Sequence, residues 1–226
     1  RAGGTLTVDA GQLDNQQTTG ANQGVEGQSL ALNLAQLLNR SGAIRADQNL
    51  SVHSSGQLDN SAGLISSSKQ LSISADQSLL NSGGTLIAGE KLGLTSASLS
   101  GDGSVLSLGD IRLDLASGLV NTGKLQANGD LDLTLQGTLD NQGSVQAGKQ
   151  LRVSSAVIEN RASGELSAAQ VTLDAADSLN NRGLIDAHIT RLNTQVLNNL
   201  GTGRIYGDQV SIATGQLTND VEDARA

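Results

Sequence analysis

The sequence contains no cysteine, proline, methionine, tryptophan or phenylalanine, and Tyr206 is its single aromatic residue. Without cysteine the chain can form neither a disulfide framework nor a thiolate metal site. A globular core normally uses aromatic side chains, because each of them buries a large area. Here hydrophobic residues make up 37% of the 226 positions and are almost all Leu, Ile, Val and Ala. We therefore expect a narrow interior filled by aliphatic layers.

Basic residues are also scarce. The chain has 14 basic and 22 acidic residues and a formal net charge of −8, which opposes non-specific binding to nucleic acid or to an anionic membrane. It lacks a run of about 18 apolar residues, so we expect no membrane insertion by this segment. The chain opens with "RAGGTLTVDAG", already inside the pattern described next. We therefore expect it to be a piece of a longer protein.

The dominant feature is an internal repeat centred on a Leu-x-Asn motif. Ten steps cover the 204 residues from Asn15 to Asn219, a mean of 20.4 residues a step. Gly101 takes the place of asparagine once. The asparagines in the repeated position are Asn15, Asn39, Asn60, Asn81, Asn121, Asn141, Asn160, Asn181, Asn199 and Asn219.

Each repeat continues in the same way after the asparagine. A glycine follows, then an apolar-polar-small triplet such as Val145-Gln146-Ala147, a short turn, and an alternating run such as Leu131–Leu135. Alternation with a period of two predicts short strands with one buried face. The leucine-rich repeat places its asparagine differently, and the glycine-rich calcium-binding repeat is missing.

A unit of this length cannot bury its apolar residues alone, so the units must stack. The sequence therefore predicts an all-β fold, a parallel β-helix of about ten coils, as one domain over residues 1–226. The repeat register is clear for about residues 4–219. At the usual spacing between strands, about 4.8 Å, ten steps would give a rod roughly 50 Å long.

These repeats resemble those of filamentous haemagglutinin. The segments "LDNQGSVQAGKQLRV", "LVNTGKLQANGDLDLTL" and "LDNSAGLISSSKQLSIS" carry the resemblance, which covers essentially the whole chain. It implies a right-handed β-helix from a large exoprotein of a two-partner secretion system, a group that includes haemagglutinin adhesins and contact-dependent growth inhibition toxins. The implied partner is an outer-membrane transporter, and the implied location is the outer face of a Gram-negative outer membrane or the secreted fraction.

The resemblance favours a stalk that projects a receptor-binding or toxin region, carried elsewhere in the full chain, towards a target cell. An adhesive module that binds surface ligands along the rod is one alternative, and a repeat region that assists toxin delivery is another. A polysaccharide-acting β-helix enzyme is the third. We expect no enzyme, no catalytic residue, no metal and no cofactor, because outward polar positions are needed on any solvated rod.

The repeated asparagines have three interpretations that the sequence leaves open. They can shape a tight or left-handed turn, form an internal ladder that bonds the neighbouring coil, or line up as a ligand column. The residues that precede them, among them Val120, Asp140 and Glu159, share no chemistry, which argues against the ligand column. We interpret all ten asparagines as structural turn residues.

Other polar residues give weaker signals. His53 and His188 are six to seven coils apart, roughly 30 Å at the strand spacing, and we interpret both as surface residues. Asp114, Asp132 and Arg152 are expected in equivalent outward positions of successive coils. That arrangement would put two acids about 5 Å apart.

The outward residues after the asparagine turn are mixed and form no threonine array. They read Arg45, Ser66, Gln126, Gln146, Ser167, Asp186 and Tyr206.

Overall fold

The computed structural model describes residues 1–20 and 23–221. The chain forms two compact units, Arg1–Leu115 and Ala116–Ala226, and each is treated by itself below. The single domain over residues 1–226 therefore stays a prediction, and its residues 21–22 and 222–226 lie outside the described part.

Both units consist of strands joined by short turns. In the first unit the strands are β1 (Ala2–Asp14), β2 (Val25–Leu38), β3 (Ala43–Ala46), β4 (Leu50–Ser54), β5 (Leu58–Asp59), β6 (Leu64–Ser67), β7 (Gln70–Leu80), β8 (Thr85–Ala88), β9 (Lys91–Ser100), β10 (Ser104–Ser107) and β11 (Asp110–Leu115). In the second they are β12 (Leu119–Asn121), β13 (Lys124–Ala127), β14 (Leu131–Leu135), β15 (Thr138–Asn141), β16 (Ser144–Ala147), β17 (Gln150–Asn160), β18 (Glu165–Ser167), β19 (Gln170–Asn181), β20 (Leu184–Asp186), β21 (Ile189–Leu200), β22 (Arg204–Tyr206) and β23 (Gln209–Asp220).

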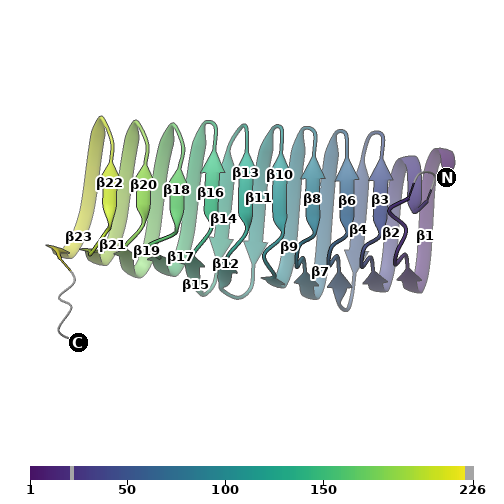
Figure 1. Cartoon of the computed structure of the whole chain (residues 1–226), viewed down its shortest axis with the longest axis horizontal. Helices are drawn as coiled ribbons and strands as arrows, with labels where there is room; N and C mark the ends of the chain where they lie inside the picture. Colours follow the sequence, from purple (N-terminus) through teal and green to yellow (C-terminus); the bar gives the residue numbers. More distant parts are fainter. Residues whose placement is uncertain (21–22, 222–226) are drawn as a thin grey trace. The chain divides into compact units, whose positions relative to one another are not determined.

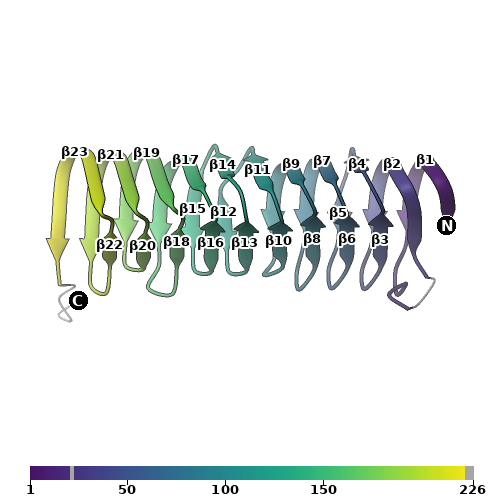
Figure 2. The ribbon, with the colours of Figure 1, turned by 90° about the horizontal axis from the view of Figure 1, so that it is seen from above.

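Within each unit every strand pairs in parallel with the equivalent strand of the next coil. In the first unit β7 pairs with β9, and the short strands β3, β6, β8 and β10 lie side by side (Figures 1 and 2). In the second unit β17 pairs with β19 and β19 with β21. The predicted parallel β-helix is confirmed, with about eleven turns of about 20 residues. Its right-handedness stays a prediction.

The interior consists of stacked aliphatic side chains, as the alternation predicts. Leu71, Leu92 and Ile111 pair in register through β7, β9 and β11, and all are at most 1% exposed. Leu151 and Val171 do the same in the second unit. Because each coil offers its neighbour a slot of similar volume, Leu, Ile and Val can replace one another without a cavity.

The backbones of successive coils approach closely at the corners. A Cβ atom on Gly89 would lie 1.9 Å from the carbonyl oxygen of Ser68 in the preceding coil. No side chain fits at that distance, so this glycine allows the coils to stack at the spacing of paired strands.

Candidate functional site: the asparagine ladders

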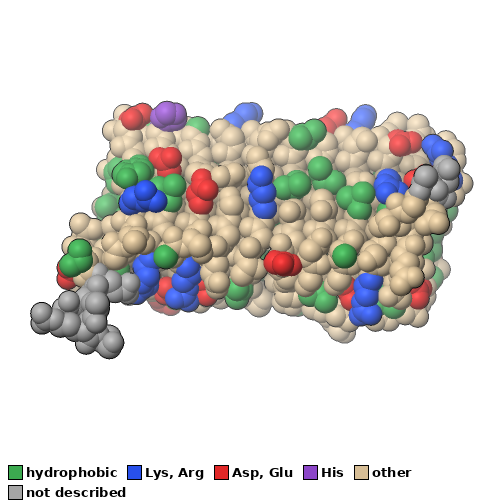
Figure 3. Space-filling view, viewed as in Figure 1, with side chains coloured by type: hydrophobic (Ala, Val, Ile, Leu, Met, Phe, Trp, Pro, Cys, Tyr) green, Lys and Arg blue, Asp and Glu red, His purple; other side chains and the backbone are tan. Residues whose placement is uncertain are grey.

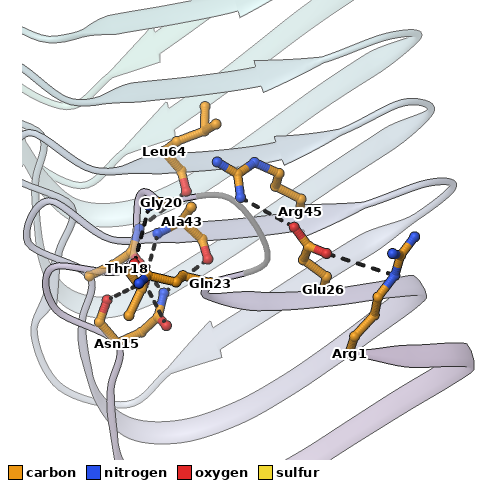
Figure 4. Close-up of polar contacts among 10 residues, drawn as sticks. Arg1, Asn15, Thr18, Gly20, Gln23, Glu26, Ala43, Arg45 and Leu64 are labelled. Atoms are coloured by element: carbon orange, nitrogen blue, oxygen red, sulfur yellow. Dashed lines mark hydrogen bonds and ion pairs between the residues drawn. The ribbon is translucent and has the colours of Figure 1, made fainter.

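In the first unit the repeated asparagines form a hydrogen-bonded ladder along the stacked coils. Asn15 Nδ2 donates to Asn39 Oδ1 at 2.7 Å, Asn39 to Asn60 at 2.7 Å, and Asn60 to Asn81 at 2.8 Å. All four side chains are buried. At the start of this ladder Thr18 Oγ1 donates to Asn15 Oδ1 at 3.0 Å (Figure 4).

The second unit has a ladder of the same kind, which runs from Asn121 to Asn219. Its amide-to-amide distances are 2.7–2.9 Å. Asn141 and Asn181 are fully buried, whereas Asn219 is exposed. The bonds follow the sequence spacing of 18 to 21 residues, so each one joins a coil to the next.

The ladder amides from Asn15 to Asn181 also bond the backbone of the adjacent coil. Asn141 Nδ2 donates to the carbonyl oxygen of Glu165 at 3.1 Å, and Asn60 Nδ2 to that of Thr85 at 3.3 Å. A buried amide whose donors and acceptor are occupied avoids the cost of unpaired polar groups. The ladder interpretation predicted bonds from each asparagine to the neighbouring coil. The structure shows these bonds and, in addition, bonds between the amides themselves. That these residues bind no ligand stays a prediction.

The left-handed turn position is not the asparagine itself. None of the ten ladder asparagines has a positive φ, whereas Gln17, Ser41 and Ala62, each two residues after a ladder asparagine, have φ of 58°, 48° and 51°. Gly83 occupies the same position after Asn81 with φ of 60°. In the first unit the asparagine therefore joins neighbouring coils, and the residue two positions later turns the chain. In the second unit Gly201, two residues after Asn199, has φ of 59°, whereas the residues two positions after Asn121, Asn141, Asn160 and Asn181 have no positive φ.

The ladder of the first unit stops at Gly101. This residue has φ of 104°, and a Cβ atom on it would lie 2.5 Å from the backbone nitrogen of Ser82. Asn81 Nδ2 keeps the usual backbone bond and donates to the carbonyl oxygen of Ser104 at 3.3 Å. Asp102 bridges the two coils by accepting from the backbone N–H of Gly83 at 2.8 Å. At this corner the bond to Asp102 links the two coils in place of the missing amide-to-amide bond.

An ion pair between an exposed arginine and a buried carboxylate flanks the first ladder. Asp59 is fully buried and accepts from Arg40 Nε at 2.5 Å and from the Ser61 hydroxyl and N–H at 2.6 and 3.0 Å. Burial raises the pKa of Asp59, but the bonds from Ser61 and Arg40 outweigh it and hold that pKa below its ordinary value. The sequence reasoning missed this pair. The signal was available, because Arg40 follows one ladder asparagine and Asp59 precedes the next.

A second ion pair lies beside the ladder of the second unit. Arg161 donates to both carboxylate oxygens of Asp140 in the preceding coil, at 2.8 and 2.9 Å. Hydrogen bonding and the positive charge of Arg161 lower the pKa of Asp140. The two-pronged geometry suits a guanidinium and a carboxylate, so this pair also holds one coil to the next.

The carboxylate column expected from the sequence would join residues of both units, so its step from Asp114 to Asp132 stays a prediction. In the first unit Arg112 pairs with Gly93, and Asp114 pairs with Thr95 and accepts from Arg112 Nε at 2.8 Å. In the second unit Asp132 pairs with Arg152. In each unit the acid therefore has a guanidinium-bearing residue or threonine beside it rather than a second acid.

The histidines lie on the surface of different units. His53 is in β4 with Nδ1 4.0 Å from Asp76, and His188 follows β20 with Nδ1 3.0 Å from Asp208. Among residues 1–20 and 23–221, no group of three His, Asp or Glu side chains could hold a metal ion. The same residues include no helix long and apolar enough to cross a membrane.

The column of outward residues that follows the asparagine turn is less polar in the first unit than we expected from the sequence. Ile87 pairs with Ser66 and with Leu106, so two aliphatic residues that the reading left out stand in this column. Both are only partly buried.

Comparison with known proteins identifies the repeat. The family model described as haemagglutinin repeat matches residues 1–62, 60–113 and 107–220. The resemblance inferred from the repeated motifs is therefore confirmed. No curated protein and no solved structure gives a significant match.

Proposed function

The chain belongs to the haemagglutinin repeat family, and we propose that it serves as a stalk segment of a secreted, cell-surface exoprotein. Family membership implies a two-partner-secretion exoprotein, so the partner is an outer-membrane transporter. The stalk projects a receptor-binding or toxin region carried by the rest of the exoprotein. The role is mechanical, and the segment itself performs no chemistry.

The observation that supports this proposal is the way the repeated polar residues are used. The buried ladder amides bond to one another and to the adjacent backbone at distances of 2.7–3.3 Å. On the face drawn in Figure 3, basic and acidic side chains are spread over the surface, and several lie next to a side chain of opposite charge. Repeated polar groups that are occupied within the coils suit a scaffold better than a row of binding sites.

A deletion series in the full exoprotein tests the stalk. Removing residues 122–160 excises two whole coils and joins Asn121 to Arg161 in register, since Asn121, Asn141 and Asn160 are paired equivalents. We expect export, surface display and target-cell attachment to persist. The matched control removes residues 122–131, half a coil, which deletes the short strand β13 and leaves one coil too short to close, and it should abolish display.

The two deletions also separate the rival functions. Loss of attachment after the two-coil deletion, with normal display, would indicate that the segment is an adhesive module rather than a stalk. Normal attachment with loss of toxin delivery would favour the delivery role. Equal display of both deletions would contradict the stacked-coil account, because register would then not matter.

Coil stacking also offers a driving force for export, which we propose as part of the same function. Leu113, Leu133 and Val153 are at most 1% exposed, so Asp in their places would bury charges without partners. We expect export of the triple Asp variant to stall at the outer membrane, measured as the ratio of surface-exposed to periplasmic protein. Unimpaired export would refute the stacking mechanism and leave the stalk role untouched.

A further inference from the structure

A groove crosses five successive coils of the second unit. It has a volume of about 880 Å³ and is lined from Gln126 to Asp208. Each coil contributes a run of three residues: one outward residue at the end of a short strand, one small residue, and one turn residue. The outward residues pair in register from coil to coil, and they are Gln126, Gln146, Ser167, Asp186 and Tyr206.

Several polar groups along this groove have no partner within the protein. In the part of the chain that the structure describes, the side chains of Gln126, Asn128 and Asp186 make no hydrogen bond or ion pair. By contrast, Gln146 Nε2 donates to Glu165 at 2.9 Å, and Ser167 donates to the same oxygen at 2.9 Å. The polar side chains near the middle of the groove are therefore held by hydrogen bonds, whereas the amide and carboxylate groups on either side of them are free to bind a ligand.

The second feature of the groove is its aromatic residue. Tyr206 is 51% exposed and stands on the last coil of the groove, paired with Asp186. A tyrosine offers an apolar ring face and a hydroxyl at its tip. It is the one aromatic residue of the whole sequence, and it lies at the groove rather than elsewhere on the surface.

The charges lining the groove select against anionic ligands. No lysine or arginine lines it, while Asp186, Asp208 and His188 do. The small residues between the walls, such as Ala147 and Ala168, leave no deep apolar pocket of the sort that anchors a peptide side chain. The lining thus favours an uncharged ligand with many hydroxyl or amide groups.

The spacing of the groove adds a requirement on ligand length. Four coil steps at the strand spacing of about 4.8 Å make the groove roughly 19 Å long. The lining repeats once per step, and one pyranose unit of a linear glycan is about as long as one step. From this geometry we propose that the groove binds an uncharged linear oligosaccharide of about four sugar units along the stacked coils. This site goes beyond the stalk role and does not depend on it.

The lone tyrosine makes the test direct, because all tyrosine fluorescence of the chain comes from Tyr206. We would titrate the chain with cellotetraose, maltotetraose and N-acetylchitotetraose, and repeat each titration by calorimetry. We expect a saturable change with at least one of them, and binding about tenfold tighter than that of the matching disaccharide. A heparin-derived tetrasaccharide should bind more weakly than the neutral probe.

Variants place the binding on the groove. Asp186→Ala and Gln126→Ala should each weaken the neutral tetrasaccharide about fivefold, and Tyr206→Ala about tenfold by calorimetry. Asp132→Ala, an outward carboxylate of the same unit outside the groove, is the matched control and should leave affinity unchanged. No saturable binding of any neutral tetrasaccharide, tighter heparin binding, or equal affinities across all variants would each overturn the proposal.

Discussion

Replacing Asn141 by alanine isolates the contribution of one rung in the middle of a ladder. Asn141 is fully buried, donates to Asn160 Oδ1 at 2.9 Å and to the Glu165 carbonyl at 3.1 Å, and accepts from Asn121 Nδ2 at 2.8 Å. Alanine removes all three bonds and leaves Asn160 Oδ1 without the ladder donor. Asn121 keeps its bond to the Ser144 carbonyl at 3.3 Å.

The expected magnitude follows from these contacts. A hydrogen bond between neutral groups contributes about 0.5–1.5 kcal/mol, and a buried polar group left unpaired costs about 1–3 kcal/mol. We expect the free energy of unfolding to fall by about 2–4 kcal/mol. Asn219→Ala, at the exposed end of the same ladder, is the matched control and should change it by less than about 0.5 kcal/mol.

The assay should resolve local from global loss, because stacked repeats can unfold coil by coil. Urea unfolding followed by far-UV circular dichroism gives the overall change. Hydrogen exchange of the Arg161 N–H, which donates to the Asn141 carbonyl at 2.9 Å, reports the corner itself. Equal losses for Asn141→Ala and Asn219→Ala, or unchanged exchange at Arg161, would refute the role assigned to the ladder.

Three further substitutions probe the same corners. Asn141→Asp should lower the stability of the fold at neutral pH, because the buried carboxylate would face Asn160 Oδ1 and its folded-state pKa would be raised. The urea midpoint should therefore recover as acidification protonates the carboxylate, and a midpoint that does not change with pH would contradict this. Because the pKa of Asp59 is lowered in the folded state, its contribution to stability is present above the ordinary carboxyl pKa and is lost as pH falls through the folded value. Asp59→Asn should therefore weaken the fall in stability at acid pH, and an unchanged fall would contradict this. Gly101→Asn restores the repeat motif but should lower stability by about 1–3 kcal/mol, because residue 101 has a positive φ and a side chain there would approach the Ser82 backbone. A higher melting temperature would contradict this.

The repeat made the fold predictable, since a step of about 20 residues with period-two alternation has few stable arrangements. Val145 and Ala147 are buried as the alternation requires. The position of Asp114 was not predictable in the same way. Register shifts such as that between Ala75 and Ser78 change which residues face each other, and a shift of two residues keeps a side chain outward but moves it to another column.

For the candidate site, too, the sequence predicted some features and not others. The spacing of the asparagines predicted that they recur at one corner, but the pattern could not decide among turn, ladder and ligand column. That choice depends on side-chain distances of under 3 Å and on φ values, which alignment does not contain. The Arg40–Asp59 pair was hidden for a related reason, because its partners are 19 residues apart and become neighbours only through coil stacking.

Small-angle X-ray scattering tests the central claim, that equivalent coils stack on one another, most directly. The strand spacing predicts that deletion of residues 122–160, two coils of the second unit, shortens the maximum dimension by about 10 Å and leaves the cross-section unchanged. A maximum dimension that stays the same, or a cross-section that widens, would contradict coil-by-coil stacking.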